Sequence, residues 1–274
     1  RYKLIRLLGE GTFGSVYLAL DIELNRQVAV KVPKPELFSQ TQDSEMYLSE
    51  ARTVAALDHP HIVPIYDMGR TPESAVFLVS RFVQGATLEA RLKFYHADFK
   101  QAASLIKLLA DALQHAHDRR LIHRDIKPAN ILIEDQSNKP YVTDFGLAVR
   151  EDDLVKQLGL AGTYAYMSPE QARGEGHRLD GRSDLFALGI MLYEILTGQR
   201  PFRGSTKNEV LHQIISIDPP LPRSIRHEIP AELERICLKA LSKPLLERYA
   251  KCHHLSEDLE HWLQAKPIAV VVDQ

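Results

Sequence analysis

Cysteine, tryptophan and long apolar runs are all scarce in this chain, which has two cysteines and one tryptophan in 274 residues. Two cysteines are too few for a disulfide scaffold, and they fit a reducing compartment. No apolar run approaches the roughly 18 residues that a membrane span requires, and the longest, residues 185–193, stops at Glu194. We therefore expect a cytoplasmic chain that makes no membrane contact of its own.

An excess of charge of one sign is also missing. Lysine and arginine total 34 and aspartate and glutamate 36, a net charge of −2, which argues against a dedicated nucleic-acid binder. The hydrophobic share of 45% and the charged share of 26% are typical of globular proteins and exclude disordered or collagen-like chains. The chain begins with Arg1 and no secretory leader follows, so we expect a domain cut from a longer protein.

The pattern of the sequence changes near residue 84. Before this point, short runs rich in Val, Tyr, Phe and Ile predict antiparallel strands at residues 2–8, 16–20, 27–32 and 75–83. One helix interrupts them at about residues 44–57 and ends at His59-Pro60, because the residue before a proline disfavours helix. These features predict a small lobe built on an antiparallel sheet.

After residue 84 the pattern becomes helical. Apolar residues from Leu105 to Ala116 recur at the spacing of one helix face, and a second helix is predicted from an N-cap at Ser183 to Gly198. Further helices are expected at residues 206–216, 231–241 and 253–264, and short strands at 131–133 and 141–142. An irregular stretch at about residues 147–180 is long enough to suggest a functional loop. The second lobe is therefore larger and mainly helical, with a cleft expected between the lobes.

Residues 9–14, Gly-Glu-Gly-Thr-Phe-Gly, match the pattern G-x-G-x-x-G, which is a weak signal by itself. A dinucleotide-binding fold would need a helix after the last glycine, whereas a strand-like run follows at residues 15–20. A hairpin folded over phosphates fits better, because glycines let backbone N–H groups approach phosphate oxygens. The motif alone leaves open a hairpin that binds nothing.

Lys31 interrupts the apolar run at residues 28–30. Such a lysine usually keeps its charge in water, but beside a carboxylate it can hold the α- and β-phosphates of a nucleotide. Glu50 is the expected partner, because Val54 and Leu57 follow it at i+4 and i+7 on the inward face of the predicted helix. Glu45 is the alternative partner and lacks this spacing.

Residues 123–130, His-Arg-Asp-Ile-Lys-Pro-Ala-Asn, lie between two apolar runs, and Asp144-Phe145-Gly146 follows 14 residues after Asn130. A solvated turn would not need Asp125, Lys127 and Asn130 at this spacing. Phosphoryl transfer needs a carboxylate for the attacking hydroxyl, a cation near the γ-phosphate and oxygen ligands for Mg²⁺. We therefore predict a phosphotransfer site here.

These motifs, with residues 168–170 (Ser-Pro-Glu) after them, occur in the order found in eukaryotic-type (Hanks-type) protein serine/threonine kinases. The sequence resembles that family over about residues 2–263, and residues 162–171 are most similar to its bacterial branch. The resemblance implies an α+β, bilobal protein-kinase-like fold. It implies a kinase domain at residues 1–265, with an N-lobe at about 1–83, a C-lobe at about 84–265, and a tail or linker stub at 266–274.

The resemblance also implies a role for each matching residue. Asp125 would be the catalytic base and Lys127 would stabilise the transferring phosphoryl group, while Asn130 and Asp144 would hold Mg²⁺. Lys31 and Glu50 would position ATP, and Glu170 with Arg248 would form a structural ion pair. The remaining nucleotide contacts would be Leu8, Gly9, Glu10, Gly11, Thr12, Phe13, Gly14, Ser15, Val16, Ala29, Arg81, Val83 and Leu132.

The implied function is transfer of the γ-phosphoryl group of Mg-ATP to serine or threonine hydroxyls of protein substrates, including autophosphorylation. Lys127 and Thr163 favour serine and threonine over tyrosine. The alternative is a pseudokinase scaffold that binds nucleotide or partners without transfer; the intact Lys31, Asp125 and Asp144 argue against it. A homodimer is left open, and so is a longer parent chain that is anchored in a membrane with this part in the cytoplasm.

Residues 147–162 contain no serine, threonine or tyrosine. Our hypothesis is that activation does not use phosphorylation of this segment. Glu151, Asp152 and Asp153 would then substitute in part for the phosphate charge. A merely solvated acidic run is the other interpretation of these three residues.

Overall fold

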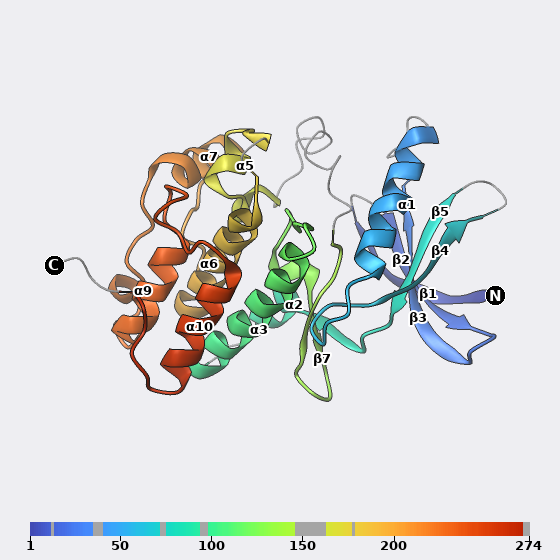
Figure 1. Cartoon of the computed structure of the whole chain (residues 1–274), viewed down its shortest axis with the longest axis horizontal. Coiled ribbons are helices and arrows are strands. Elements are labelled where there is room, and N and C mark those ends of the chain that lie inside the picture. The colour runs from blue at the N-terminus through green and yellow to red at the C-terminus, as the bar shows by residue number, and fades with distance from the viewer. Residues whose placement is uncertain are drawn as a thin grey trace. The chain divides into compact units, whose positions relative to one another are not determined.

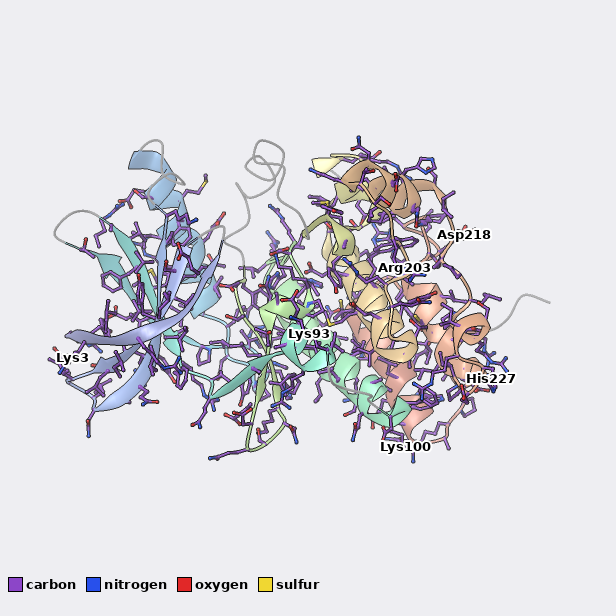
Figure 2. All side chains as sticks on the ribbon, turned by 180° about the vertical axis from the view of Figure 1, so that it is seen from behind. Lys3, Lys93, Lys100, Arg203, Asp218 and His227 are labelled. Carbon is purple, nitrogen blue, oxygen red and sulfur yellow. The ribbon has the colours of Figure 1, made fainter. Side chains whose placement is uncertain are left out.

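The computed structural model of the chain describes residues 1–11, 14–34, 41–71, 75–93, 98–145, 163–176 and 179–270. The chain divides into two compact units, Arg1–Gly85 and Ala86–Gln274 (Figure 1). Figure 2 shows charged side chains such as Lys3, Lys93 and Asp218 at the surfaces of these units. Charged side chains of both signs therefore lie at the surface.

The smaller unit is built on an antiparallel sheet, which confirms the predicted N-lobe. Its strand order is β1-β2-β3-β5-β4, and the helix α1 (Thr41–Ala55) packs against β4. The strands are β1 (Tyr2–Gly11), β2 (Gly14–Asp21), β3 (Arg26–Pro33), β4 (Ile65–Arg70) and β5 (Val76–Arg81). The sequence reasoning missed β4, because Asp67 and Gly69 are residues that strands disfavour.

The register of this sheet separates two faces. Val30 lies opposite Val79, and Ala19 lies opposite Val28; these four side chains form a buried cluster. Val16 lies opposite Lys31, and Ala29 lies two residues before Lys31 on the same strand. Since side chains alternate along a strand, Val16, Ala29 and Lys31 share the face opposite to the buried cluster.

The larger unit is mainly helical, as predicted. α3 packs against α6 and α10 around the core, and a three-stranded sheet of order β6-β7-β8 accompanies these helices. The helices are α2 (Leu88–Leu92), α3 (Phe99–His117), α5 (Pro169–Ala172), α6 (Gly181–Thr197), α7 (Lys207–Ser216), α8 (Pro222–Ile225), α9 (Ala231–Ala240) and α10 (Cys252–Leu263). The strands are β6 (Gly85–Thr87), β7 (Ile131–Glu134) and β8 (Pro140–Val142), and single 3₁₀ turns cover Pro128–Asn130 and Thr163–Tyr166.

α6 begins earlier than the sequence predicted. Its N-cap is Asp180, whose carboxylate accepts the backbone N–H of Arg182, whereas Ser183 lies inside the first turn. The Ser183 hydroxyl instead donates to Glu170 Oε1 at 2.8 Å. The predicted N-cap at Ser183 was therefore wrong, because both residue types favour N-caps and only tertiary packing decides between them. The helix ends at Gly198, as predicted, and this glycine adopts a left-handed conformation.

The predicted irregular stretch is partly regular, because a 3₁₀ turn and α5 occupy residues 163–166 and 169–172. At the end of the chain, the backbone N–H of Ala269 donates to Asp258 Oδ1 at 2.7 Å, which ties the start of the predicted tail to α10. In the described part of the chain, no helix has both the length and the apolar character needed to cross a bilayer.

Candidate active site

The glycine-rich segment forms the predicted hairpin, because β1 and β2 pair up to Gly11 opposite Gly14. Thr12 and Phe13 lie outside the described residues. Gly14 has a φ of +151°, and a Cβ built on it would lie 2.3 Å from the carbonyl oxygen of Val32. At Gly9, by contrast, a Cβ would meet nothing within 4 Å. Glycine is therefore required at position 14, because β3 passes too close for a Cβ. No such contact requires a glycine at position 9.

We expect Gly14→Ala to destabilise the smaller unit by about 1–3 kcal/mol, because alanine resists this φ and collides with β3. Displacing the hairpin should also weaken ATP binding. Urea unfolding and titration with a fluorescent ATP analogue measure the two effects. Gly9→Ala is the matched control for stability and should leave the unfolding midpoint unchanged. Equal destabilisation by the two variants would contradict this account of the hairpin.

Lys31 and Glu50 are both half-buried residues of the smaller unit, on β3 and α1 respectively. Val54 and Leu57, which follow Glu50 at i+4 and i+7, are buried. The alternative partner Glu45 is exposed and binds Arg70 with an N–O distance of 2.8 Å. In the structure Glu45 therefore binds a different cation, that of Arg70, and Glu50 lies on the inward side of α1.

The adenine contacts implied by the resemblance are divided between the units. Leu8, Val16 and Ala29 are half-buried positions of the sheet in the smaller unit, and Leu132 is half-buried on β7 of the larger one. The backbone N–H of Arg81 donates to the carbonyl of Pro64 at 3.0 Å, so this N–H is already engaged. A contact between adenine and the Arg81 backbone would therefore use its carbonyl oxygen.

Three of the predicted catalytic residues meet in the segment of residues 123–130, here called the catalytic loop. The Lys127 ammonium lies 2.6 Å from Asp125 Oδ2. The Asn130 amide donates to the same oxygen at 2.9 Å and to the Asp125 carbonyl at 2.8 Å. Both contacts use one carboxylate oxygen of Asp125, and the other has no hydrogen bond to the described residues. That second oxygen can accept a proton from an incoming hydroxyl group.

The two predicted magnesium ligands lie next to each other across the β7–β8 ladder. Ile131 pairs with Val142, and the backbone N–H of Thr143 donates to the Asn130 carbonyl at 3.0 Å. Asp144 follows directly in a left-handed conformation, with a φ of 62°. Because the Asn130 NH₂ group is used within the loop, its Oδ1 remains as a ligand atom. An amide oxygen and a carboxylate fit Mg²⁺, which takes few protein ligands beside phosphate and water.

The catalytic loop is held by Asp184, a residue of α6 that the sequence reasoning missed. Its Oδ2 accepts the backbone N–H of His123 at 2.9 Å, and its Oδ1 accepts that of Arg124 at 2.8 Å. Burial alone would raise the pKa of this carboxyl group, but hydrogen bonds and nearby imidazoles outweigh burial and lower it. Asp184 lies in the first turn of α6, where acidic residues are common, so the local sequence did not distinguish it.

His123 also ties the loop to the segment around Asp144. Its Nε2 lies 2.9 Å from the carbonyl oxygen of Thr143, and its ring centroid lies 4.7 Å from that of Phe145. Both His123 and Phe145 are buried, so these contacts fix the catalytic loop against the segment that carries Asp144. The loop and the segment that carries Asp144 are therefore positioned together.

The predicted structural ion pair is present in the larger unit. Arg248 Nη1 and Nη2 each lie 3.0 Å from one oxygen of Glu170, and the two side chains are 0% and 2% exposed. Burial alone would raise the pKa of Glu170, but the hydrogen bonds and charge of Arg248 lower it below its usual value. The pair joins α5 to the segment before α10.

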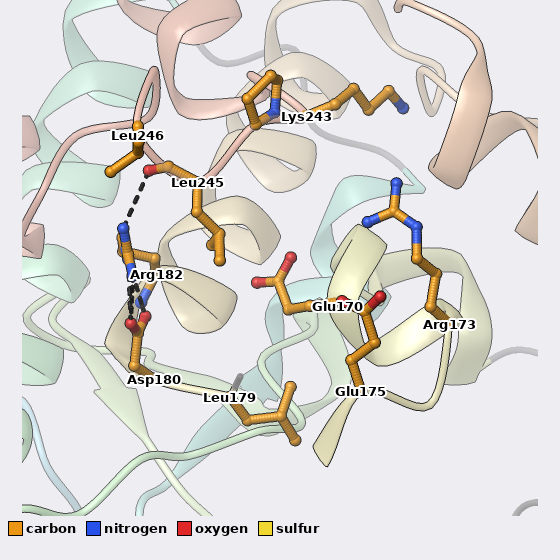
Figure 3. A pocket seen from close by; sticks show the side chains of 10 residues that line it. Glu170, Arg173, Glu175, Leu179, Asp180, Arg182, Lys243, Leu245 and Leu246 are labelled. Atoms are coloured by element: carbon orange, nitrogen blue, oxygen red, sulfur yellow. Dashed lines mark hydrogen bonds and ion pairs between the residues drawn. The ribbon is translucent and has the colours of Figure 1, made fainter. Parts of the chain in front are cut away.

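A pocket of about 730 Å³ opens beside this ion pair (Figure 3). On one wall, Arg182 binds both Asp180 and the carbonyl of Leu245. Burial lowers the pKa of Lys243 to about 7, and its ammonium donates to the carbonyls of Gln213 and Ile214. The lining residues are Glu170, Arg173, Glu175, Leu179, Asp180, Arg182, Lys243, Pro244, Leu245 and Leu246. None of them belongs to the predicted ATP site.

Several predicted features fall outside the described residues. They are Gly146, the acidic residues Glu151, Asp152 and Asp153, and the side chain of Thr163. The hypothesis about activation therefore stays a prediction from the sequence.

Comparison with known proteins agrees with the motifs. The family model for the protein kinase domain matches residues 2–259. The serine/threonine-protein kinase PknB of Mycobacterium leprae is 41% identical over 273 residues, which cover 94% of this chain and 42% of the relative. PrkC of Bacillus subtilis is 34% identical over 265 residues, covering 95% of this chain and 40% of the relative. The chain thus spans about two-fifths of the length of these relatives.

The fold of this chain is also found in a solved structure. The crystal structure of the Mycobacterium tuberculosis PknI kinase domain has a TM-score of 0.75 to this chain at 24% sequence identity. The similarity covers 95% of each of the two chains. These findings confirm the family and the fold predicted from the sequence. This chain belongs to the protein kinase family and is similar to its bacterial serine/threonine branch.

Proposed function

We propose that this chain transfers the γ-phosphoryl group of ATP to serine and threonine hydroxyls of protein substrates. The observation that carries the proposal is the arrangement of Asp125, Lys127 and Asn130 in one hydrogen-bonded loop. Phosphoryl transfer depends mainly on positioning and on charge stabilisation, and this loop supplies a carboxylate, a cation and an amide for both. Its attachment to Asp184 holds the loop in place before a substrate arrives.

In the proposed reaction, Asp125 orients the substrate hydroxyl with the carboxylate oxygen not used by its neighbours and accepts its proton. The Lys127 ammonium, which lies 2.6 Å from Asp125 Oδ2, offsets the negative charge of the phosphoryl group as it moves. Asn130 Oδ1 and the Asp144 carboxylate would hold Mg²⁺, which when bound neutralises charge on the phosphates. Each of these groups belongs to the larger unit.

The contacts to the nucleotide are those that the family resemblance implies. Backbone N–H groups of residues 9–15 would contact the phosphates, and Lys31 held by Glu50 would orient them. Leu8, Val16 and Ala29 of the smaller unit are the proposed apolar contacts of the adenine ring, and Leu132 is the further contact implied by the resemblance. The Arg81 carbonyl and the Val83 backbone would bind its polar edge. Val16, Ala29 and Lys31 share one sheet face, which supports this arrangement.

The serine/threonine class of substrate is supported by Lys127 in the catalytic loop and by the names of the relatives, PknB and PrkC. We place the kinase unit in the cytoplasm, where ATP is available. The two cysteines, Cys237 and Cys252, are buried and unbridged, which fits that reducing compartment. Activity without phosphate on residues 147–162 is part of the same proposal, because that segment has no hydroxyl group.

A direct assay tests the proposal. The chain is incubated with γ-labelled ATP, Mg²⁺ and a generic basic protein, and labelled amino acids are identified after hydrolysis. We expect phosphoserine and phosphothreonine, loss of labelling on chelation, and recovery on adding Mg²⁺. Mass spectrometry of the chain itself should find any phosphate outside residues 147–162. ATP binding without transfer would instead establish the pseudokinase alternative, and labelled tyrosine would overturn the substrate class.

A further inference from the structure

The segment between α7 and α8 is rich in proline and lies at the surface of the larger unit. Residues 217–222 read Ile-Asp-Pro-Pro-Leu-Pro and are here called the proline segment. The segment has no regular secondary structure before α8 begins at Pro222, and Figure 2 shows Asp218 at the surface. Ile217 and Leu221 are 48% and 56% exposed, although both are large apolar residues. None of these residues has a role in the proposed phosphotransfer.

The exposure of the proline segment follows a period of three. Pro219 is half-buried and Pro222 is buried, whereas the residues at positions 217, 218, 220 and 221 are exposed. A polyproline II helix has about three residues per turn, so positions 219 and 222 share one face and the exposed positions occupy the other two. Leu221 has a φ of −60° and a ψ of 126°, which lie near the polyproline II values. These observations indicate a short polyproline II segment with one face against the protein and two faces in solvent.

The backbone of the proline segment offers hydrogen-bond acceptors that the rest of the unit does not use. Among the hydrogen bonds of the described residues, none involves the carbonyl oxygens of residues 217–220. Pro219 and Pro220 also lack a backbone N–H group. Unused carbonyls and missing donors are typical of polyproline II segments, which form no hydrogen bonds within themselves. The acceptors of this segment are therefore available to donors of another molecule.

Both ends of the proline segment are fixed to helices. The backbone N–H of Ile217 donates to the carbonyl of Gln213 at 3.0 Å, at the end of α7. The carbonyl of Leu221 accepts the backbone N–H of Ser224 at 2.9 Å and its hydroxyl at 2.7 Å, at the start of α8. A segment held in this way loses little conformational freedom when it binds, so the entropy cost of docking is low.

The ordinary local roles of proline explain only part of the segment. Proline is common shortly after a helix ends, which accounts for Pro219, and at the first position of a helix, which accounts for Pro222. Neither role applies to Pro220, and neither explains why Leu221 is more than half exposed. The two open faces therefore carry a proline and two apolar side chains that have no structural purpose in the described unit.

We propose that the proline segment is a docking site for a partner protein whose groove is lined by aromatic side chains, the type of groove that binds polyproline II segments. Aromatic rings of the partner pack against Ile217, Pro220 and Leu221, and its N–H or O–H groups donate to the unused carbonyls. The inference goes beyond the proposed function and does not rest on it, because no step of phosphoryl transfer involves this surface.

The test titrates the whole chain into a panel of isotope-labelled SH3, WW and EVH1 domains, which bind polyproline II segments through such grooves. We expect at least one domain to bind, with NMR shift changes centred on the aromatic residues of its groove. The double variant Ile217→Ala with Leu221→Ala should weaken this binding about tenfold or more, because it removes both apolar anchors. Pro220→Gly should also weaken it, because glycine makes the segment flexible before binding.

Ile22→Ala with Leu24→Ala is the matched control. It removes the same two types of side chain, here 58% and 56% exposed, from a surface of the smaller unit, and binding should stay within about twofold of the wild type. If no domain of the panel binds, the inference is overturned. It is equally overturned if the control weakens binding as much as the segment variant does, which would indicate non-specific apolar adhesion, or if neither double variant weakens it. The measurement needs no ATP, so its result is independent of whether the chain transfers phosphate.

Discussion

Replacing Asp125 by asparagine is expected to lower kcat for phosphotransfer by about 10²- to 10⁴-fold, the usual contribution of a general base. The amide has the shape of the carboxylate and can still accept a hydrogen bond, so the loop should keep its conformation. It is neutral, however, and cannot take the proton of the substrate hydroxyl. KM for ATP should change little, because Asp125 acts on the acceptor. Initial rates at varied ATP concentration measure both constants.

Asp135→Asn is the matched control for this variant. Asp135 belongs to the same unit, is 58% exposed, and pairs with Arg91 at 3.1 Å. Exposed ion pairs contribute little to stability, so the control should match the wild type in both stability and kcat. If Asp125→Asn retains more than about a tenth of the wild-type kcat, the carboxylate is not the base and the proposed mechanism is wrong.

Replacing Arg248 by methionine is expected to destabilise the larger unit by about 3–5 kcal/mol, because the variant leaves the Glu170 carboxylate buried without its cation. The guanidinium also donates to the carbonyls of Ser242, Arg182 and Lys243, at 2.8, 2.9 and 3.1 Å respectively. Their loss adds to the effect. Urea unfolding followed by circular dichroism measures the change.

The double variant Glu170→Gln with Arg248→Met separates charge from packing. Since it removes the unpaired charge, it should be more stable than Arg248→Met alone. A double variant no more stable than the single one would show that the backbone hydrogen bonds of Arg248, and not its ion pair, hold this region.

The destabilisation caused by Arg248→Met should also depend on pH, because Glu170 is titratable. In the wild type the pKa of Glu170 is lowered, so its contribution is present above the ordinary pKa of glutamate and is lost as the pH falls through the lowered value. In Arg248→Met, burial without a cation should raise this pKa above its ordinary value. The carboxyl group then becomes neutral at a higher pH, and the stability difference between wild type and variant should shrink as the pH falls from 7 to 5.

The predicted site residues could be named from the sequence because phosphoryl transfer needs particular residue types close together along the chain. The spacing of Asp125, Lys127 and Asn130 is local, and the structure shows these three in direct contact. The choice of Glu50 over Glu45 also followed from local periodicity, because α1 is a regular helix whose faces repeat. Such inferences depend on short-range geometry, which the order of residues determines.

Contacts between distant segments could not be predicted in this way. Asp184 lies about 60 residues beyond the loop that it holds, and no local pattern distinguishes it from a capping or surface acid. The start of α6 at Asp180 and the strand β4 were missed for the same reason, since packing overrode local propensity at both.

The amino-acid order by itself therefore determined the family, the two-unit organisation and the identity of the predicted catalytic groups, because these follow from residue type and local spacing. Only the tertiary structure decided what holds the catalytic loop in position, namely the buried Asp184, which accepts two of its backbone N–H groups. This contact joins elements far apart in the chain. Buried charges need partners wherever folding brings them, and that requirement leaves no mark on the local sequence.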